Sequence, residues 1–403
     1  MKKILVISPS EISSDQRVIR QIKTLVNNNY YVISAGFGNL APLSQNHKHI
    51  QVINKHNFKL LFISLNRAYN FLEENILPML NLSFLSEKIN PFILDFKNKL
   101  KDIDFDFIIS NELLTLPVSI YLANKNNLPL NRIILDLHEY YPKEFEDNLI
   151  WKLTKRKFYN YLLNKYKKYL NRINITTVSN KIAELYKNNY DIKNIYIIRN
   201  VPYYQDIKPV FTVGNEFIRL VHVGGAIKSR KLEISIQALK YTQKKFILDF
   251  YLIANSEDKI KYLNYLKKLA NEINKKTHNK VNFYQPLPHN QLIKFISTYD
   301  LGIFTLYPSN INYTYALPNK IFEYIQARLG IVITPNPDMA SLVKEYNIGL
   351  VSEDFSPISF AKTLDKLNTE LINKFKINSD TAAKILNYNN EEKILLSIIQ
   401  SNI

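Results

Sequence analysis

Residues 218–233 read IRLVHVGGAIKSRKLE and combine an apolar strand, a pair of glycines and the basic start of a helix. A nearly continuous apolar run is typical of a parallel strand that is buried on both faces. Gly224 and Gly225 let the backbone approach a ligand closely, and Arg230 beside a helix N-terminus favours an anion. This stretch therefore predicts a strand–turn–helix unit that binds a diphosphate; a turn without a ligand is the alternative.

The alternation of short apolar strands with longer helical patterns extends through most of the chain and predicts doubly wound α/β sheets. It is interrupted at 57–100, where either helices packed on the first sheet or an exposed apolar surface for a membrane would explain the Phe- and Leu-rich sequence. Strands are expected at 3–8, 30–37, 50–53, 105–110, 132–137, 175–179, 195–199, 218–223, 246–254, 281–284, 301–306, 331–334 and 349–352.

The alternation also breaks at 200–215 and restarts at Ile218. A chain of 403 residues is longer than one hydrophobic core usually serves. We therefore predict two α/β domains, 1–205 and 206–403.

The composition and the missing motifs exclude several classes of protein. The chain has no Cys, which excludes a disulfide scaffold, thiolate zinc sites, Fe–S clusters and cysteine nucleophiles. It has neither a P-loop nor the Gly-x-Gly-x-x-Gly pattern of dinucleotide sites. We find no signal-peptide pattern and no apolar stretch of about 20 residues, so a soluble or peripheral protein is expected.

The charge balance points to an anionic partner. The chain carries 53 Lys and Arg against 35 Asp and Glu, a formal net charge of +18, which suits nucleic acid, a phospholipid surface or a phosphorylated substrate. Residues 151–172 contain no acidic residue, and aromatic residues alternate with the basic ones. This segment suits an anionic membrane surface, and a solvated helix face is the alternative.

Two segments resemble metal sites, but we expect no metal at either. Asp102, Asp104 and Asp106 form Asp-x-Asp patterns that run directly into a strand, so a solvated turn explains them better. His47 and His49 are expected in a polar loop with no acidic or Cys partner nearby.

The strand expected at 132–137 delivers His138 and Glu139 at its C-terminal end. Open α/β sheets bind their ligands at this end of the strands. Carboxylates and a titratable imidazole crowd within residues 138–146, a density that packing does not require. We therefore expect His138 to face a substrate; a purely structural hydrogen bond is the alternative.

A further helix is expected to start at Pro318, and it carries Glu323 among apolar neighbours. A buried carboxylate requires a partner. The two vicinal hydroxyls of a ribose would supply one, and a structural salt bridge is the alternative.

These segments together resemble the bacterial glycosyltransferases of the GT-B fold, in the large retaining group often called family 4. The resemblance rests on PNKIFEY at 318–324, on Gly224-Gly225 with Arg230 and on DLHE at 136–139. Weaker matches fall in the family's order at 15–18, 177–179 and 199–202.

The resemblance implies an α/β protein with GT-B architecture, in which two Rossmann-like domains face a central cleft. The N-terminal domain, 1–205, would bind the acceptor. The C-terminal domain, 206–403, would bind a nucleotide-sugar donor, with a final helix that can pack back on the N-terminal domain.

The resemblance also assigns roles in donor binding. Arg230 would bind the donor diphosphate, Asn319 and Lys320 the sugar and phosphates, and Glu323 the ribose. Glu323 is the second Glu of the family's Glu-x7-Glu element, whose first Glu would fall at Tyr315. Gly225 stands where many members carry a basic residue.

In the first domain, the resemblance places His138 and Glu139 at the reacting sugar and makes Asp15 and Arg17 candidates on the acceptor side. The implied reaction is glycosyl transfer from a nucleotide-diphosphate sugar, UDP- or GDP-linked, with retention and without a metal or other cofactor. The acceptor would be a glycan or lipid-linked glycan for capsule, lipopolysaccharide or glycolipid synthesis. The expected location is cytoplasmic, peripheral on the inner face of the membrane.

Other functions remain open at this stage. The same fold hosts nucleotide-sugar epimerases and phosphorylases. The lack of a recognisable pyridoxal-binding Lys motif argues against a phosphorylase. A non-catalytic protein that binds nucleic acid or other anions would explain the net charge of +18 but not Glu323 or the Gly224–Arg230 loop. We therefore expect no nucleic-acid partner.

Overall fold

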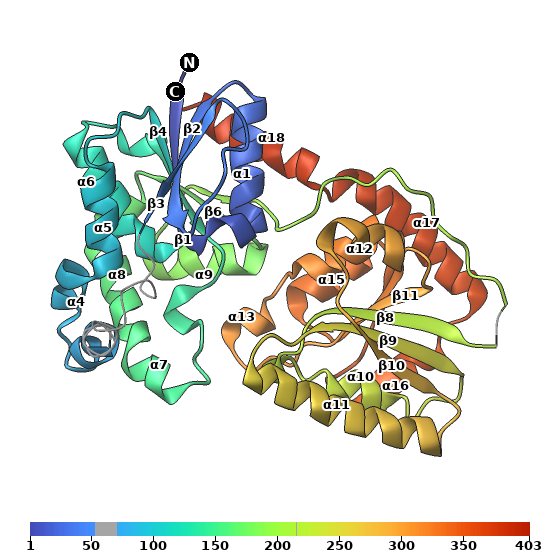
Figure 1. Ribbon diagram of the computed structural model, residues 1–403. Coiled ribbons are helices and arrows are strands. Elements are labelled where there is room, and N and C mark those ends of the chain that lie inside the picture. The colour runs from blue at the N-terminus through green and yellow to red at the C-terminus, as the bar shows by residue number, and fades with distance from the viewer. Residues whose placement is uncertain (53–70, 215) are drawn as a thin grey trace. The chain divides into compact units, whose positions relative to one another are not determined.

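The computed structural model describes residues 1–52, 71–214 and 216–403 (Figure 1). The chain divides into two compact units. The first comprises Met1–Arg199, Asn310–Asn312 and Glu391–Ile403, and the second comprises Asn200–Ser309 and Tyr313–Asn390. The first unit thus ends its main segment close to the boundary expected near residue 205.

The first unit is built on a parallel sheet of seven strands in the order β3-β2-β1-β4-β5-β6-β7. The order reverses between β1 and β4, and such a switch point leaves a crevice at the C-terminal edge of a sheet. The strands are β1 (Lys3–Glu11), β2 (Tyr31–Phe37), β3 (His47–Gln51), β4 (Phe107–Asn111), β5 (Ile133–Leu137), β6 (Asn174–Thr177) and β7 (Ile195–Ile197).

The second unit repeats this plan with six parallel strands in the order β10-β9-β8-β11-β12-β13. Its switch point lies between β8 and β11. The strands are β8 (Ile218–Gly225), β9 (Phe246–Ile253), β10 (Lys280–Tyr284), β11 (Leu301–Phe304), β12 (Gly330–Ile333) and β13 (Gly349–Val351). The two doubly wound α/β domains expected from the sequence are therefore confirmed.

Helices follow most strands and cover both faces of each sheet. In Figure 1, α10, α11 and α16 lie on one face of the second sheet, and α12, α15 and α17 lie on the other. The longer helices are α1 (Gln16–Asn27), α4 (Ser83–Ile89), α5 (Pro91–Leu100), α6 (Leu116–Lys125), α7 (Leu149–Leu153), α8 (Lys155–Leu170), α9 (Asn180–Tyr190), α10 (Glu233–Ala238), α11 (Glu257–Lys276), α12 (His289–Ile296), α14 (Asn319–Gln326), α15 (Pro337–Glu345), α16 (Pro357–Asp365), α17 (Thr369–Ile385) and α18 (Tyr388–Gln400).

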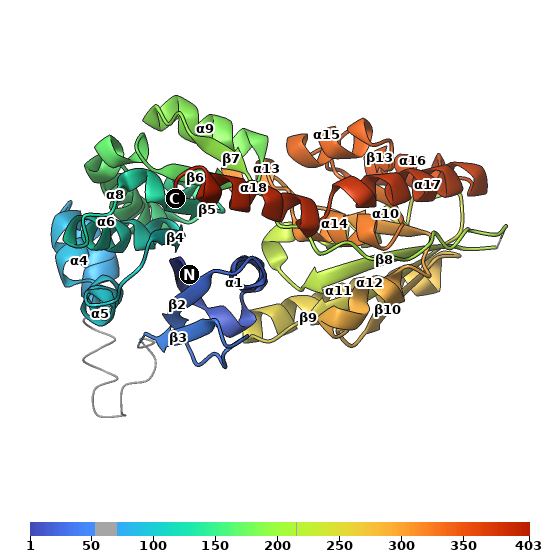
Figure 2. The ribbon, with the colours of Figure 1, turned by 90° about the horizontal axis from the view of Figure 1, so that it is seen from above.

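The last helix, α18, contributes to the core of the first unit. Leu395, Ile398 and Ile399 are buried in the same cluster as Ile4 and Ile134, which lie on β1 and β5 (Figure 2). Burying an aliphatic side chain of this size contributes about 1.5–3 kcal/mol. The C-terminal residues are thus part of the first unit's hydrophobic core.

The expectation for the two histidines near residue 48 was wrong. His47 and His49 lie on the edge strand β3, not in a polar loop, and both bond the hydroxyl of Ser34 on β2, at 2.8 and 2.9 Å. Burial, with the charge of His49, lowers the pKa of His47 to about 4. An edge strand has a sheet neighbour on one side only, so it needs no long apolar run and its sequence resembles a loop.

Segment 57–100 is only partly described, and its apolar run at 60–63 lies outside the described residues. Its later part forms helices: η3 (Leu72–Ile76), α3 (Leu77–Met79), α4 and α5. Phe92, Ile93 and Phe96 of α5 are buried, whereas Met79, Leu80 and Phe84 are exposed. The buried residues of α5 fit the reading of packed helices, whereas a role of the exposed residues at a membrane stays a prediction.

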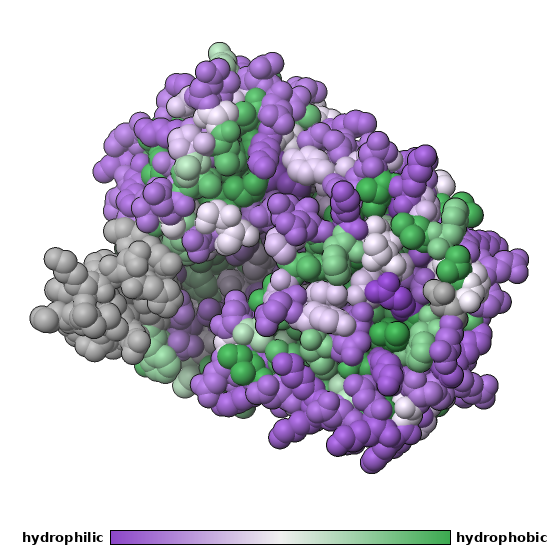
Figure 3. All heavy atoms as spheres, turned by 45° about the vertical axis from the view of Figure 1, so that its right-hand side comes forward, coloured by the Kyte–Doolittle hydropathy of each residue, from purple (hydrophilic) through white to green (hydrophobic). Residues whose placement is uncertain are grey.

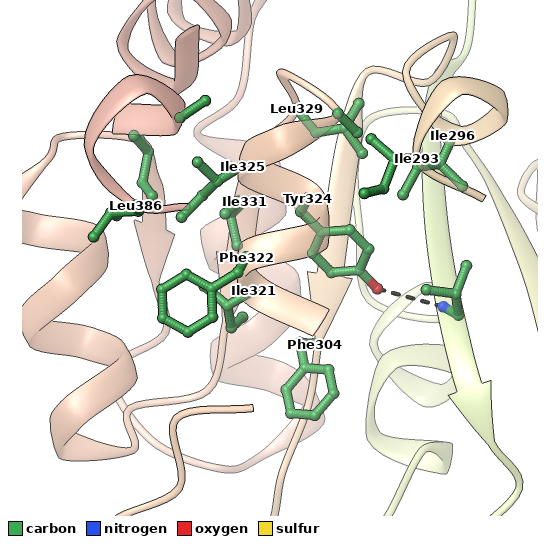
Figure 4. Packing of buried hydrophobic residues seen from close by; sticks show 14 of the residues in the cluster. Ile293, Ile296, Phe304, Ile321, Phe322, Tyr324, Ile325, Leu329, Ile331 and Leu386 are labelled. Carbon is green, nitrogen blue, oxygen red and sulfur yellow. Dashed lines mark hydrogen bonds between the residues drawn. The ribbon is translucent and has the colours of Figure 1, made fainter. Parts of the chain in front are cut away.

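Helix α14 lies in the centre of the second unit's core. Ile321, Phe322 and Ile325 are fully buried against residues of β11, β12 and α12 (Figure 4). The hydroxyl of Tyr324 accepts a hydrogen bond from the Val223 amide at 3.4 Å and donates to the Ile303 carbonyl at 3.2 Å. These contacts join α14 to β8 and β11, so they fix the helix that carries Lys320 and Glu323.

We expect Gly302→Ala to destabilise the second unit. A Cβ atom at Gly302 would lie 2.4 Å from the Tyr324 ring, so the ring and α14 would have to move away from β11. Overpacking of this kind typically costs about 1–3 kcal/mol. Urea unfolding should show this decrease in the free energy of unfolding. The matched control is Gly214→Ala, where nothing lies within 4 Å of the added methyl group; equal stability of the two variants would contradict the packing argument.

Candidate functional site

The second unit brings two cations together above Gly224, the first of the paired glycines at the end of β8. Gly224 has a φ of +148°, which side chains other than glycine adopt only with strain. A Cβ atom placed there would lie 3.7 Å from both Nη1 of Arg230 and Cε of Lys320. Arg230 follows β8 in the loop, whereas Lys320 comes from α14, so residues far apart in the sequence converge as predicted.

Lys320 is joined to the buried carboxylate of Glu323. Its Nζ lies 2.9 and 3.1 Å from the two carboxylate oxygens, and Asn319 Nδ2 lies 3.4 Å from one of them. Glu323 is 1% exposed, which makes this pairing necessary. The salt bridge considered from the sequence is therefore present.

Charge is not balanced in this cluster of Arg230, Lys320 and Glu323. Among the described residues, Arg230 makes no ion pair, so two cations face one carboxylate. A ligand that brings both negative charge and hydroxyl donors would complement the cluster. Gly225 adds no charge, and Tyr315 lies half-buried in the turn before α14.

His222 is a site residue that the sequence analysis did not single out. It lies on β8 and is almost fully buried, with Nδ1 3.1 Å from the Ile303 carbonyl. Burial, together with the charges of Arg230 and Lys320, lowers its pKa to about 3, so the ring is neutral. Nδ1 therefore carries the hydrogen that bonds the carbonyl.

The other nitrogen of His222 is left as an acceptor. Nε2 is buried, has no hydrogen-bond partner among the described residues and lies 4.0 Å from the Cβ position at Gly224. A buried unpaired acceptor is unfavourable unless a ligand or water satisfies it. The sequence signal was a polar residue inside an apolar strand next to a glycine pair.

In the first unit, Asp136 at the end of β5 organises a buried polar network. Its carboxylate accepts from Arg17 Nε and Nη2 at 2.7 and 2.8 Å, from Gln21 Nε2 at 3.0 Å and from Thr176 Oγ1 at 2.7 Å. Burial alone would raise its pKa, but the positive charges of Arg17 and His138 outweigh burial and hold it well below the usual range. Asp136 is thus ionised.

The two acceptor-side candidates occupy structural positions. The Arg17 side chain is buried, and its remaining Nη1 donates to the Ile198 carbonyl at 2.9 Å. The carboxylate of Asp15 caps α1 by accepting from the Arg17 and Val18 amides at 3.1 and 3.2 Å. This geometry favours positioning roles for both, and their contact with an acceptor stays a prediction.

His138 is oriented by Asp136 and partly open to solvent. Its Nε2 lies 2.9 Å from the Asp136 carboxylate, and 22% of its side chain is exposed. Burial lowers the pKa of His138, but the charge of Asp136 outweighs burial and raises it above the ordinary value. An imidazole held at one nitrogen by a carboxylate presents the other to a substrate in a fixed orientation.

Two glutamates accompany His138 at this edge of the sheet. Burial raises the pKa of Glu112. The pKa of the solvent-exposed Glu139 is also raised, by the protein atoms around it and by the charge of Glu112. Because Glu139 is exposed, water screens part of this effect on its pKa. Glu112 directly follows β4 with φ +67°, a strained conformation that often marks functional sites.

The metal-like segments do not resemble ion sites. Asp102 pairs with Lys125 and Asp104 with Lys3, at 3.0 and 2.8 Å on the surface, so the predicted solvated turn is confirmed. Within the described ranges, no three His, Cys, Asp or Glu residues are grouped so as to hold a metal ion.

Comparison with known proteins identifies the fold. No protein-family model and no curated protein matches the sequence. Among solved structures, sucrose-phosphate synthase from Thermosynechococcus elongatus is similar, with a TM-score of 0.72 and 13% identity over 100% of this chain and 99% of that one.

Two further structures extend this comparison. WaaG, a glycosyltransferase involved in lipopolysaccharide biosynthesis, matches with a TM-score of 0.65 and 14% identity over 99% of both chains. An E. coli protein described as trehalose-6-phosphate bound with UDP-2-fluoro glucose matches with a TM-score of 0.68 and 13% identity over 100% of both chains. The chain therefore has the GT-B fold that these glycosyltransferases share.

Replacing Asp136 by Asn tests the buried network. We expect the pKa of His138 to fall and the free energy of unfolding to drop by about 3–5 kcal/mol, because Arg17 would remain buried without its counter-charge. The raised pKa of His138 stabilises the folded wild type below about pH 6.5, and this contribution disappears as the pH rises through the folded pKa. The variant should lose this pH dependence.

The measurements are an NMR titration of the His138 ring and denaturant unfolding across pH. Asp102→Asn, which removes an exposed carboxylate paired with Lys125, is the control and should change neither. An unshifted His138 titration in the Asp136 variant would show that the two side chains are not coupled.

Proposed function

We propose that the protein is a glycosyltransferase that moves a sugar from a nucleotide-diphosphate sugar to a glycan or lipid-linked glycan, with retention and without a metal. The observation that carries this proposal is the convergence of Arg230 and Lys320 at Gly224, beside the buried Glu323. The shared fold supports it, because one similar structure is described as bound with UDP-2-fluoro glucose and another as a glycosyltransferase of lipopolysaccharide biosynthesis.

The geometry suits a nucleotide diphosphate in a specific way. The diphosphate would lie over Gly224, where no side chain blocks it, and would accept hydrogen bonds from Arg230 and Lys320. The ribose hydroxyls would donate to Glu323 and share that carboxylate with Lys320. Each charge-assisted hydrogen bond of this kind contributes about 1.5–3 kcal/mol.

The same donors would assist the reaction. Negative charge grows on the departing diphosphate as its bond to the sugar breaks, and fixed cations stabilise that charge more in the transition state than in the ground state. Arg230 and Lys320 are held in place by the fold, so they need little reorganisation. In the first unit, His138 is oriented by Asp136 and would contact the reacting sugar, with Glu139 beside it.

We expect a UDP- or GDP-sugar to raise the thermal unfolding midpoint of the protein, and Arg230→Ala or Glu323→Gln to reduce this shift strongly. Loss of one charge-assisted bond should weaken binding by about 10- to 150-fold. A thermal-shift series with UDP-, GDP-, ADP- and CMP-sugars measures this, since ligand binding to the folded state adds to its stability.

The control is Lys261→Ala, which removes a 69%-exposed lysine of the same unit and should leave binding unchanged. Undiminished binding in both site variants would remove the site assignment. Product analysis with and without a glycan acceptor separates transfer from the alternative, a nucleotide-sugar epimerase, which changes the sugar without an acceptor.

A surface of the first unit fits a lipid-linked acceptor. Leu149 and Ile150 on α7 are 69% and 68% exposed, and the apolar Met79, Leu80 and Phe84 are exposed nearby on α3, in the following turn and on α4. Helices α4 and α7 both pack on α8, whose Lys157 Nζ donates to the Met79 carbonyl at 2.9 Å (Figure 1). We call this surface the basic apolar face.

An anionic bilayer would complement the basic apolar face. Apolar side chains on short helices insert at the acyl boundary, while the lysines of α8 interact with anionic headgroups. Figure 3 shows one face of the molecule, on which hydrophilic residues predominate and apolar groups lie among them. No helix among the described residues has the length and apolar character needed to span a bilayer.

Flotation with lipid vesicles tests this docking. We expect binding to vesicles that contain phosphatidylglycerol, at least tenfold weaker binding for Leu149→Ser/Ile150→Ser, and weaker binding in high salt. The control is Ile377→Ser/Ile385→Ser, which changes two exposed isoleucines on α17 of the second unit. No binding by the wild type, or equal loss in both double variants, would exclude the basic apolar face as the membrane contact.

A further inference from the structure

The first unit contains a cavity that neither the donor cluster nor the His138 network uses. Its volume is about 330 Å³, and it lies between η3, the turn before α7, α7 itself and the start of α8. A cavity of this size accommodates a small ligand such as one sugar ring. Its lining includes Glu144, Trp151, Tyr159, Asn75 and Asn148.

Aromatic rings form one side of this cavity and hold one another in place. The Trp151 ring lies 6.5 Å from that of Tyr159 and 6.1 Å from that of Phe145. Tyr159 in turn contacts the Tyr141 ring edge-on at 5.2 Å. Such rings offer rigid apolar area at low entropic cost, and this suits the C–H face of a pyranose.

Two polar side chains on the cavity wall, Glu144 and Asn148, keep hydrogen-bonding groups that the described residues do not use. The carboxylate of the half-buried Glu144 accepts no hydrogen bond from the described residues. Asn148 uses its side-chain oxygen to cap α7, accepting from the Trp151 amide at 3.1 Å, and this leaves its amide hydrogens available. A carboxylate and an amide that face a cavity are suited to hydroxyl groups, which both donate and accept.

Glu144 lies in a negative environment. Burial, with the charges of Glu139 and Glu112, raises its pKa to about 8, and Lys155 offsets this only in part. Near neutral pH Glu144 therefore mostly holds its proton, and above about pH 8 it becomes an anion beside Lys155, which also lines the cavity. A neutral polyol is favoured, because its hydroxyls can donate to the carboxyl groups.

We propose that this cavity binds an unphosphorylated sugar ring of the acceptor, with the ring packed against Trp151 and Tyr159 and a hydroxyl bonded to Glu144. This inference rests on the proposed transferase function. It also agrees with position, because Glu144 interacts electrostatically with Glu139, which follows His138 directly in the same unit. The cavity therefore lies on the same side of the unit as the candidate catalytic residues.

The chain offers a direct probe of this cavity, because Trp151 is its only tryptophan. Fluorescence excited selectively at tryptophan should change saturably when methyl glycosides of glucose, galactose or N-acetylglucosamine are added to the full chain. Above about pH 8, where Glu144 is ionised, glucose 6-phosphate should bind at least about tenfold more weakly, because its phosphate is repelled by the carboxylates. Glycerol serves as the control for general solvent effects.

Two variants sharpen the test. Glu144→Gln keeps the shape of the side chain but cannot ionise, so above about pH 8 it should weaken sugar binding about tenfold and reduce the discrimination against glucose 6-phosphate. Glu184→Ala, which removes an exposed carboxylate on α9 of the same unit, should match the wild type. A merely structural role for Glu144 would leave the discrimination unchanged.

The outcomes separate this inference from the proposed function. If nucleotide sugars stabilise the protein but no sugar changes Trp151 fluorescence up to its solubility limit, the cavity proposal is wrong and the donor site stands. If glycerol gives the same response, or glucose 6-phosphate binds as well as glucose, the cavity proposal is also wrong. If no nucleotide sugar binds in the thermal-shift series, the proposed function itself fails.

Discussion

In both units the described strands run parallel, and this places the C-terminal ends of all strands of a sheet at one edge. Residues that directly follow strands far apart in the sequence must then lie near one another. His138 follows β5 and Glu112 follows β4, while Gly224 and Gly225 end β8. The parallel arrangement is therefore what makes a site from residues that the sequence separates.

The two sheet edges differ in how their buried charges are compensated. In the first unit the ionised Asp136 is compensated by Arg17, Gln21, Thr176 and His138, so this carboxylate is satisfied without a ligand. In the second unit Arg230 and Lys320 exceed the single carboxylate of Glu323, so that cluster is incomplete. The first arrangement fixes the orientation of His138, and the second would suit a ligand of opposite charge.

The sequence predicted the strands well because buried parallel strands require long apolar runs. The sequence did not predict His47 and His49 as part of β3, because a strand at the sheet edge does not require such a run. A strand end and a helix start each carry a local signature, but the convergence of Arg230 with Lys320 was implied only by the resemblance to GT-B glycosyltransferases. The resemblance made Arg17 a candidate on the acceptor side, but its partner Asp136 is 119 residues away, and only the fold shows that the pair is buried.

Other site features have no local signature at all. Glu112 has an unusual backbone conformation that the neighbouring residues in the sequence do not predict. The cavity at Trp151 and Glu144 forms only when η3, α7 and α8 pack together. The two local charge excesses thus have opposite sign, positive at Gly224 and negative around Glu144, although the sequence shows only the net charge of +18.

This opposition of charge bears on the chemistry. An anionic leaving group needs fixed cations, which Arg230 and Lys320 supply, while an acceptor hydroxyl must lose its proton as the new bond forms. The pKa of Glu139 lies above the ordinary range, so this group holds a proton more readily than an ordinary glutamate does. In the proposed reaction an ionised Glu139 would therefore be suited to receive the proton of the acceptor hydroxyl, because a base with a raised pKa accepts a proton more readily.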